Sequence, residues 1–217
     1  MGRRFSSLSG FVLAGGESRR MGQPKPLLAL AGETMLERQV RLLRPICRSV
    51  AVIGLSDGPP SMDVALITDV IRGRGPLGGI FTGLLYTRTE FNLFLGCDLP
   101  FVTARFLEFL VRRAPQCGAT MAEMPAGGIQ PLCAVYRRAA LPIVRANLDA
   151  GRNKAQALAR RLCSAAIPWY EIARAGLSPR IFANINTPED YETAKRILNG
   201  EPAAEGRDQA PGLCISS

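Results

Sequence analysis

The chain has 217 residues, of which 47% are hydrophobic and 21% charged, so it is long and apolar enough to bury the core of one large domain. No apolar run approaches the roughly 18 residues that a membrane-spanning helix needs. The basic N-terminus also lacks the apolar segment of a signal peptide. The sequence therefore excludes a largely disordered chain and predicts a cytoplasmic protein without membrane contacts.

The formal net charge of +9 indicates a preference for anionic partners such as nucleotides, nucleic acids or acidic lipids. The chain contains six cysteines, none of them in a Cys-x-x-Cys pair, and no histidine. This composition excludes histidine-based metal sites, Ser-His-Asp triads and Cys-His dyads.

Apolar runs alternate with helix-like stretches along the chain, beginning with a strand at 9–14, a helix at 34–43 and a strand at 50–54. Further helices are predicted to begin after Pro76 and to span 103–113. The remaining predicted strands are 64–67, 91–96, 119–123, 131–136, 165–168 and 181–185. Nearly continuous apolar strands between amphipathic helices predict a three-layer α/β fold, with a mostly parallel central sheet covered on both faces.

We expect a single domain over residues 8–198, because no internal repeat or change in composition marks a second one. Residues 199–217 are rich in Gly, Pro, Ala and charged residues and show no periodicity. Residues 1–7 and 199–217 are therefore predicted to be flexible tails.

A glycine-rich basic loop follows the first predicted strand and reads LAGGESRRMGQPK from Leu13 to Lys25. Ligands of open parallel sheets bind at the carboxyl ends of the strands. Gly15 and Gly16 let the backbone approach a ligand closely, consecutive N–H groups can bind an anion, and Arg20 adds positive charge. The loop matches neither the Walker A nor the G-x-G-x-x-G pattern. The alternative is a glycine turn that serves only geometry.

An acidic residue, Asp98, follows the predicted strand 91–96 in the segment CDLP. A carboxylate at the carboxyl end of a strand, opposite a phosphate-binding loop, is well placed to hold Mg²⁺. Asp98 is therefore the strongest metal candidate. The alternative is an Asx turn ahead of Pro100.

Two asparagines near the end of the predicted domain, Asn184 and Asn186, lie on the same side of an extended chain and can face a ligand or metal. A purely structural role for them is equally open. Thr187 to Asp190 is interpreted as a helix cap with proline in the first turn. The segment GPLGG at 75–79 is a helix start, either beside a ligand or without one.

These segments together resemble a known family. Residues 13–25 resemble the L-A-G-G-x-S-x-R-M-G-x-x-K signature of nucleotidyltransferases that make the dinucleotide form of the molybdenum cofactor, and specifically of molybdenum cofactor guanylyltransferases. The segments GPLGG, CDLP and NINTPED resemble further motifs of that family, so the resemblance spans roughly residues 10–198. Related cytidylyl- and uridylyltransferases usually read L-A-A-G, so Gly16 favours guanine.

The resemblance implies a Rossmann-like domain that transfers GMP from GTP to molybdopterin or its molybdenum-loaded form, releasing pyrophosphate with Mg²⁺ as cofactor. It also implies transient contacts with molybdenum-insertion proteins and acceptor molybdoenzymes. The site residues that the resemblance implies fall into four groups. For the nucleotide they are Leu13, Ala14, Gly15, Gly16, Lys25, Asp69 and Asp98, and for catalysis Lys25, Asp98 and Arg20. Asp98 is implied as the metal ligand, and Asn184 and Asn186 as the pterin side.

The chain departs from the family pattern in two places. Where the family often carries an asparagine after the second strand, this chain reads VIGL at 52–55, so that contact is missing or comes from the backbone. Segments 128–132 and 151–154 match the pterin-side elements only loosely.

Three alternatives stay open at this point. The nearest is a molybdopterin cytidylyltransferase or a sugar-phosphate nucleotidyltransferase of the same fold, and another is a nucleotide-binding regulator without turnover. The third is a basic nucleic-acid-binding protein, which the net charge suggests. Against it, aromatic residues make up only 6% of the chain and do not alternate with Lys or Arg.

Overall fold

The computed structural model describes residues 5–15, 24–56, 62–114, 118–159, 161–162 and 164–200. Its main strands are β1 (Phe5–Leu13), β4 (Cys47–Ile53), β5 (Ala65–Ile67), β6 (Phe91–Gly96), β7 (Ala119–Glu123), β8 (Ile129–Arg137) and β9 (Ser164–Ile167). They form one sheet in the order β5-β4-β1-β6-β8-β7-β9. All pairings are parallel except the two that β8 makes with β6 and β7. The sheet is therefore mostly parallel, as predicted.

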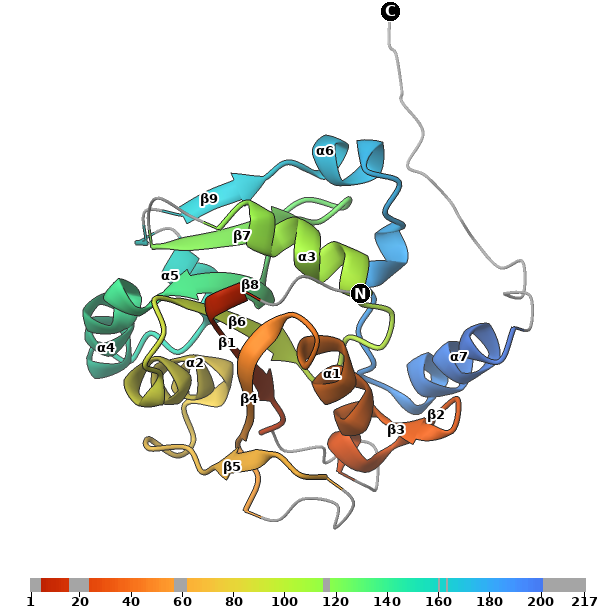
Figure 1. The fold of residues 1–217 in the computed structure, drawn as a ribbon, viewed down its shortest axis with the longest axis horizontal. Helices are drawn as coiled ribbons and strands as arrows, with labels where there is room; N and C mark the ends of the chain where they lie inside the picture. Colours follow the sequence, from red (N-terminus) through yellow and green to blue (C-terminus); the bar gives the residue numbers. More distant parts are fainter. Residues whose placement is uncertain are drawn as a thin grey trace, which may run out of the picture.

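Helices cover both faces of this sheet, which confirms the three-layer α/β fold (Figure 1). One layer holds α2 (Gly75–Tyr86), α4 (Leu141–Asp149) and α5 (Ala155–Ala159), and the other holds α1 (Met35–Leu43), α3 (Ala104–Arg112) and α6 (Trp169–Arg174). The helix α7 (Pro188–Leu198) packs beside a small hairpin of β2 (Ala29–Leu30) and β3 (Glu33–Thr34). Short 3-10 helices are η1 (Lys25–Leu27), η2 (Arg138–Ala140) and η3 (Pro179–Phe182).

Alternating side chains of the strands serve the two layers. In β1, Leu8 and Val12 join the core under α1 and α3, whereas Phe11 and Leu13 join the core under α2 and α4. The ring of Phe11 stacks on that of Phe94 with their centroids 5.1 Å apart. Because both faces are buried, strands of this kind are apolar throughout, which is why the sequence showed them as continuous runs.

Most predicted elements are present, and the bounds of several differ from the prediction by one to four residues. The strands β6 and β7 have the predicted bounds. The strand β1 begins at Phe5, which pairs with Cys47, so residues 5–7 belong to the sheet and not to a flexible tail. Residues 1–4, and 201–217 of the second predicted tail, lie outside the described residues.

The strand predicted at 181–185 is wrong. Residues Pro179–Phe182 form a 3-10 helix, which starts where the Ser178 hydroxyl accepts a hydrogen bond from the Arg180 amide. Its apolar residues are buried by packing against other elements and not by pairing in the sheet. The ring of Phe182 packs edge-on against the rings of Phe106 and Trp169. An apolar run of this length does not distinguish a buried strand from a short buried helix.

Thr187 to Asp190 form the predicted cap of α7. The Thr187 hydroxyl accepts a hydrogen bond from the Asp190 amide at 3.1 Å, and the Asp190 carboxylate accepts one from the Thr187 amide at 2.8 Å. This reciprocal pair is a capping box, with Pro188 in the first turn. In the part of the chain that the structure describes, no helix has the length and hydrophobicity to cross a membrane.

Candidate active site

The centre of the sheet contains a point where the order of the strands reverses. The strand β1 lies between β4 and β6, and the chain runs outward from it in both directions. In open α/β sheets the ligand-binding crevice lies at such a point, outside the carboxyl ends of the strands. Backbone hydrogen bonds from Ala14 to Ile53 and from Cys97 to Leu13 continue the sheet for one residue past the strand ends.

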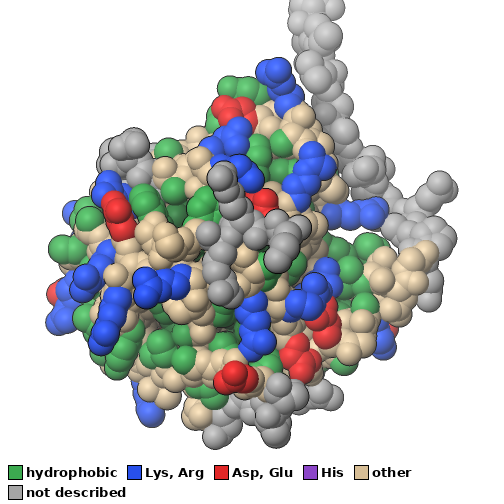
Figure 2. All heavy atoms as spheres, viewed as in Figure 1, with side chains coloured by type: hydrophobic (Ala, Val, Ile, Leu, Met, Phe, Trp, Pro, Cys, Tyr) green, Lys and Arg blue, Asp and Glu red, His purple; other side chains and the backbone are tan. Residues whose placement is uncertain are grey.

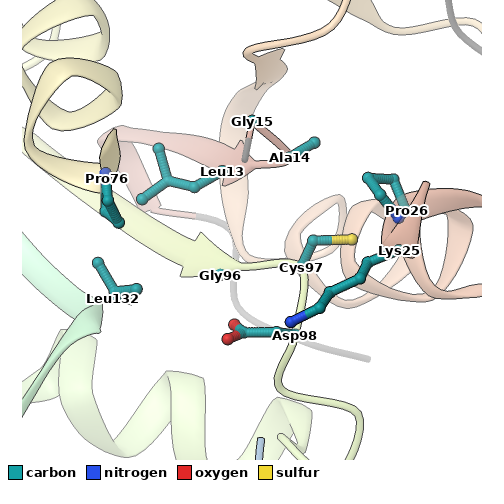
Figure 3. Close-up of a pocket in the computed structure, with 10 residues that line it drawn as sticks. All are labelled: Leu13, Ala14, Gly15, Lys25, Pro26, Pro76, Gly96, Cys97, Asp98 and Leu132. Carbon is teal, nitrogen blue, oxygen red and sulfur yellow. The ribbon is translucent and has the colours of Figure 1, made fainter. Parts of the chain in front are cut away.

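A pocket of about 150 Å³ opens at this point (Figure 3). The ends of β1 and β6, the start of η1, the start of α2 and one residue of β8 contribute its walls. The lining residues are Leu13, Ala14, Gly15, Lys25, Pro26, Pro76, Gly96, Cys97, Asp98 and Leu132. The ammonium group of Lys25 points toward the carboxylate of Asp98 across the pocket.

The carboxylate of Asp98 is enclosed by the end of its own strand. A Cβ atom on Gly96 would lie 2.7 Å from Asp98 Oδ1, so only glycine leaves room for the carboxylate there. Burial raises the pKa of Asp98, and the positive charge of Lys25 acts in the opposite direction. The side-chain amide of Asn184 donates a hydrogen bond to Asp98 Oδ2 at 3.3 Å, and the backbone amide of Ile185 donates one to the backbone carbonyl of Asp98 at 2.9 Å.

Lys25 is held from the far end of the sequence. Its Nζ donates to Asn186 Oδ1 at 3.1 Å, a contact between residues 161 positions apart. The amide of Asn186 in turn donates to the Asp190 carboxylate at 2.8 Å. The structure therefore brings Lys25, Asp98, Asn184 and Asn186 together. Asn184 contacts Asp98 and Asn186 contacts Lys25, although no strand contains the two asparagines.

The oxygen atoms at Asp98 fit a magnesium ion. Asn184 Oδ1 is buried and has no hydrogen-bond partner in the described part of the protein. An amide oxygen beside a carboxylate is the hard donor set that Mg²⁺ takes from proteins. Among the described residues no group of three or more His, Cys, Asp and Glu could hold a metal ion. The remaining ligands of a magnesium ion would therefore come from substrate phosphates and water.

A second cavity, of about 640 Å³, adjoins the first and has a different character. That volume lies within the range of small-molecule binding sites. Its lining residues are Leu13, Gly15, Ile53, Asp69, Gly73, Gly75, Pro76 and Gly79. Asp69 Oδ1 is buried without a hydrogen-bond partner in the described ranges, and burial raises the pKa of this carboxyl group. The two cavities share Leu13, Gly15 and Pro76.

Two glycines have close neighbours at the second cavity: Gly79 lines it, and Gly54 lies against Gly15, a lining residue. Sequence reasoning gave Gly54 no role in packing. Gly54 has a φ of +92°, and a Cβ on it would lie 2.5 Å from the Cα of Gly15. A Cβ on Gly79 would lie 2.8 Å from Leu13 Cδ2. The signal for Gly54 was a glycine directly after a buried strand. Its close approach to Gly15 explains why the turn after β4 carries a glycine.

The other predicted site residues have mixed outcomes. Gly16 and Arg20 lie outside the described residues. Segment 128–132 reaches the site, because Leu132 lines the first pocket and its amide donates to the Gln130 side chain at 3.1 Å. Segment 151–154 contributes to neither cavity, and Arg152 instead donates to Asn147 Oδ1 at 3.2 Å.

An acid and a lysine face each other here at the strand reversal of a Rossmann-like sheet, beside a glycine turn and a nucleoside-sized cavity. This combination defines the class of nucleotidyltransferases. A family model described as the MobA-like NTP transferase domain matches residues 10–166. A "probable molybdenum cofactor guanylyltransferase" of Carboxydothermus hydrogenoformans is 31% identical over 188 residues, which cover 87% of this chain and 95% of that protein. The chain belongs to this family of MobA-like nucleotidyltransferases, the molybdenum cofactor guanylyltransferases.

Solved structures share the fold. Molybdopterin-guanine dinucleotide biosynthesis protein A of Archaeoglobus fulgidus superposes with a TM-score of 0.76 at 24% identity, covering 88% of this chain and 99% of its own. The 2-C-methyl-D-erythritol 4-phosphate cytidylyltransferase of Thermus thermophilus superposes with a TM-score of 0.67 at 15% identity, covering 87% of this chain and 98% of its own. The same fold thus serves proteins named for different bases and acceptors.

Proposed function

We propose that this protein transfers GMP from GTP to molybdopterin or its molybdenum-loaded form, releasing pyrophosphate in a magnesium-dependent reaction in the cytoplasm. The observation that carries the proposal is the facing pair of Lys25 and Asp98 at the strand reversal, next to the cavity of Asp69. The name of the Carboxydothermus relative supports a guanylyl group as the one transferred and a form of the molybdenum cofactor as the acceptor.

The proposed reaction needs alignment and charge neutralisation more than proton transfer. The terminal phosphate of molybdopterin is already an anionic nucleophile, so no general base is required to activate it. This suits a chain without histidine. Lys25 acts as a point charge that stabilises negative charge developing on the phosphates, held in place by its bond to Asn186.

Asp98 and Asn184 would hold the magnesium ion through Asp98 carboxylate oxygens and Asn184 Oδ1. A magnesium ion at this position supplies charge neutralisation and orients the phosphate oxygens. The pterin is proposed to bind beside Asn184 and Asn186, the two asparagines that contact Asp98 and Lys25.

The cavity lined by glycines is proposed to take the guanosine part of GTP. The triphosphate is proposed to lie against Leu13, Ala14 and Gly15 at the end of β1. The sequence motif assigns Gly16 and Arg20 to the same contact. Asp69 presents its unpartnered carboxylate oxygen to the nucleoside. A carboxylate accepts hydrogen bonds from neighbouring N–H or O–H groups, so it suits either the base or the ribose.

The face of the molecule in Figure 2 gives no support to the nucleic-acid alternative. Lys and Arg side chains are spread over several elements on that face and do not form one stripe. A duplex or single strand is held by a basic groove or patch that follows its backbone.

The experiment that tests the proposal is pyrophosphate release with Mg²⁺ and molybdopterin, comparing GTP, CTP, ATP and UTP, each also without the pterin. We expect release with GTP only when molybdopterin is present. A preference for CTP would keep the transfer and overturn the base. No release with any nucleotide would contradict the proposal. Asp149→Asn, an exposed change on α4, serves as the control for any Asp98 variant.

A further inference from the structure

The segment that carries Lys25 is attached to α7 at two points. The first is the bond from Lys25 Nζ to Asn186 Oδ1. The second joins Tyr191 to the β2 strand that follows η1: the Tyr191 hydroxyl donates to the Ala29 carbonyl at 2.7 Å. Helix α7 also packs against β2 (Figure 1).

These contacts close a ring. Asp190 accepts hydrogen bonds from the amides of both Asn186 and Thr187 at 2.8 Å, which fixes Asn186 to the first turn of α7. Tyr191 is the next residue of that turn and reaches back to Ala29. The segment is also anchored to α1, because the Leu28 carbonyl accepts a hydrogen bond from the Met35 amide at 2.9 Å. The two attachments to α7, four residues apart, add to this and set the orientation of the Lys25 end relative to α7.

The rest of the ring leads to Asp98. Asn184 and Ile185, just before Asn186, donate to the carboxylate and the carbonyl of Asp98. The same short segment therefore holds Asp98 on one side and Lys25 on the other, and Tyr191 closes the ring from outside the pocket. Tyr191 does not line either cavity.

We propose that Tyr191 is a positioning residue, whose hydroxyl holds the Lys25 segment against α7 and so keeps the Lys25 ammonium group opposite Asp98. This rests on the proposed function only for the role of Lys25 at the phosphates. Charge stabilisation depends on preorganised geometry. A lysine held in one position therefore stabilises the phosphates better than a lysine that moves among several positions.

The variant Tyr191→Phe tests this, because it removes the hydroxyl and keeps the ring that packs near Lys195. Its matched control is Tyr170→Phe, a change at an exposed tyrosine of α6. We expect Tyr191→Phe to lower kcat for pyrophosphate release about three- to tenfold, the loss of one hydrogen bond, with KM for GTP little changed. We expect Tyr170→Phe to behave as wild type, and melting temperatures verify that both variants fold.

A double-mutant cycle separates positioning from a general structural effect. In a Lys25→Met background we expect Tyr191→Phe to have no further effect on kcat, because the group that it positions is gone. An equal fold-loss in both backgrounds would overturn the proposal. So would a wild-type kcat in the Tyr191→Phe protein.

A second readout does not depend on turnover. The chain has only three lysines, Lys25, Lys154 and Lys195, so reductive methylation of each can be followed by peptide mass spectrometry. We expect Tyr191→Phe to increase the labelling rate of Lys25 severalfold relative to Lys154. An unchanged ratio would overturn the positioning role. If the wild type releases no pyrophosphate with any nucleotide, the proposed function fails, and this ratio still decides the role of Tyr191.

Discussion

The two adjoining cavities, around Asp98 and around Asp69, form the two halves of one cleft and are built in different ways. The half around Asp98 carries two facing charged side chains, Lys25 from η1 and Asp98 from the end of β6, which amide side chains of the segment before α7 contact. The half around Asp69 consists mainly of backbone, because four of its eight lining residues are glycines. In the half around Asp98 the functional groups are therefore side chains, whereas in the half around Asp69 the backbone mainly determines the shape of the cavity.

This difference predicts different responses to substitution. Side-chain groups act on charge and can be removed individually without filling space. A wall of glycines has few groups to remove, but one added carbon changes its shape. Substitutions in the first half should therefore reduce turnover, and those in the second should reduce nucleotide affinity.

The largest effect is expected for Asp98→Asn. In the proposed mechanism Asp98 holds magnesium at the phosphates, so removing its carboxylate should lower kcat by about 10²- to 10³-fold, the loss typical of one electrostatic group at a reacting centre. The fold should survive, since the Ile185 bond to the Asp98 carbonyl does not involve the side chain. Steady-state kinetics with Asp149→Asn as control checks this. A wild-type rate would remove Asp98 from the mechanism.

Asp69→Asn should instead raise KM. Its carboxylate lies in the cavity proposed for the nucleoside, so the interaction is made equally in the ground state and the transition state. A hydrogen bond to a charged group contributes about 1.5–3 kcal/mol, so a rise in KM of roughly 10- to 100-fold with kcat kept is expected. GTP titration by calorimetry and kinetics together test it. A selective loss of kcat would move Asp69 to the chemical step.

Gly54→Ala tests the shape of the glycine half. The new Cβ would meet the backbone of Gly15 at 2.5 Å, so the turn that carries Gly15 must move. The matched control is Gly127→Ala, where φ is also positive, +85°, and no atom lies within 4 Å of the Cβ. Both lose about 1–2 kcal/mol from the left-handed backbone. Only Gly54→Ala should also weaken GTP binding, and equal affinities in the two variants would contradict the close approach.

The smallest effect is expected for the pH dependence of the melting temperature. Burial raises the pKa of Asp98 and Asp69, so the folded state binds protons more tightly than the unfolded state. Each ionised carboxylate therefore costs stability as the pH rises from below the ordinary aspartate pKa of about 3.9 through the raised value. Without ligands, Asp98→Asn should melt above wild type at neutral pH and lose this advantage in acid.

The opposite sign is expected for Asp190, whose pKa is lowered, first by the hydrogen bond from the Asn186 amide. Its ionised form stabilises the fold, and this contribution disappears as the pH falls through the lowered pKa. Melting curves of Asp190→Asn and Asp98→Asn over the same pH series should therefore diverge in opposite directions from wild type. Parallel curves would show that burial does not govern the Asp98 side.

The half of the cleft that depends on side chains was the more predictable from sequence. Asp98 follows a strand that the apolar pattern located at its observed bounds, and Lys25 lies in a motif with many fixed positions. The alternation of Asn184 and Asn186 suggested that both side chains face one site, and they contact Asp98 and Lys25, although a 3-10 helix precedes them where a strand was expected.

The remaining features leave weaker signals. A buried antiparallel strand is as apolar as a parallel one, so nothing in β8 announced its direction. The helices α5 and α6 have five and six residues, too few to show a helical period. Tyr191 bonds to a backbone carbonyl, which every residue has, so no residue type at position 29 could indicate the contact.

The ring through Tyr191 and Asn186 also closes late along the chain. Its closing contacts join residues 161 and 162 positions apart, whereas the strands β1, β4, β5 and β6 and the cavity of Asp69 lie within the first 100 residues. Contacts so distant in sequence are slow to form, and synthesis proceeds from the N-terminus. A chain still emerging from the ribosome can thus shape the cavity of Asp69 well before Lys25 is held opposite Asp98.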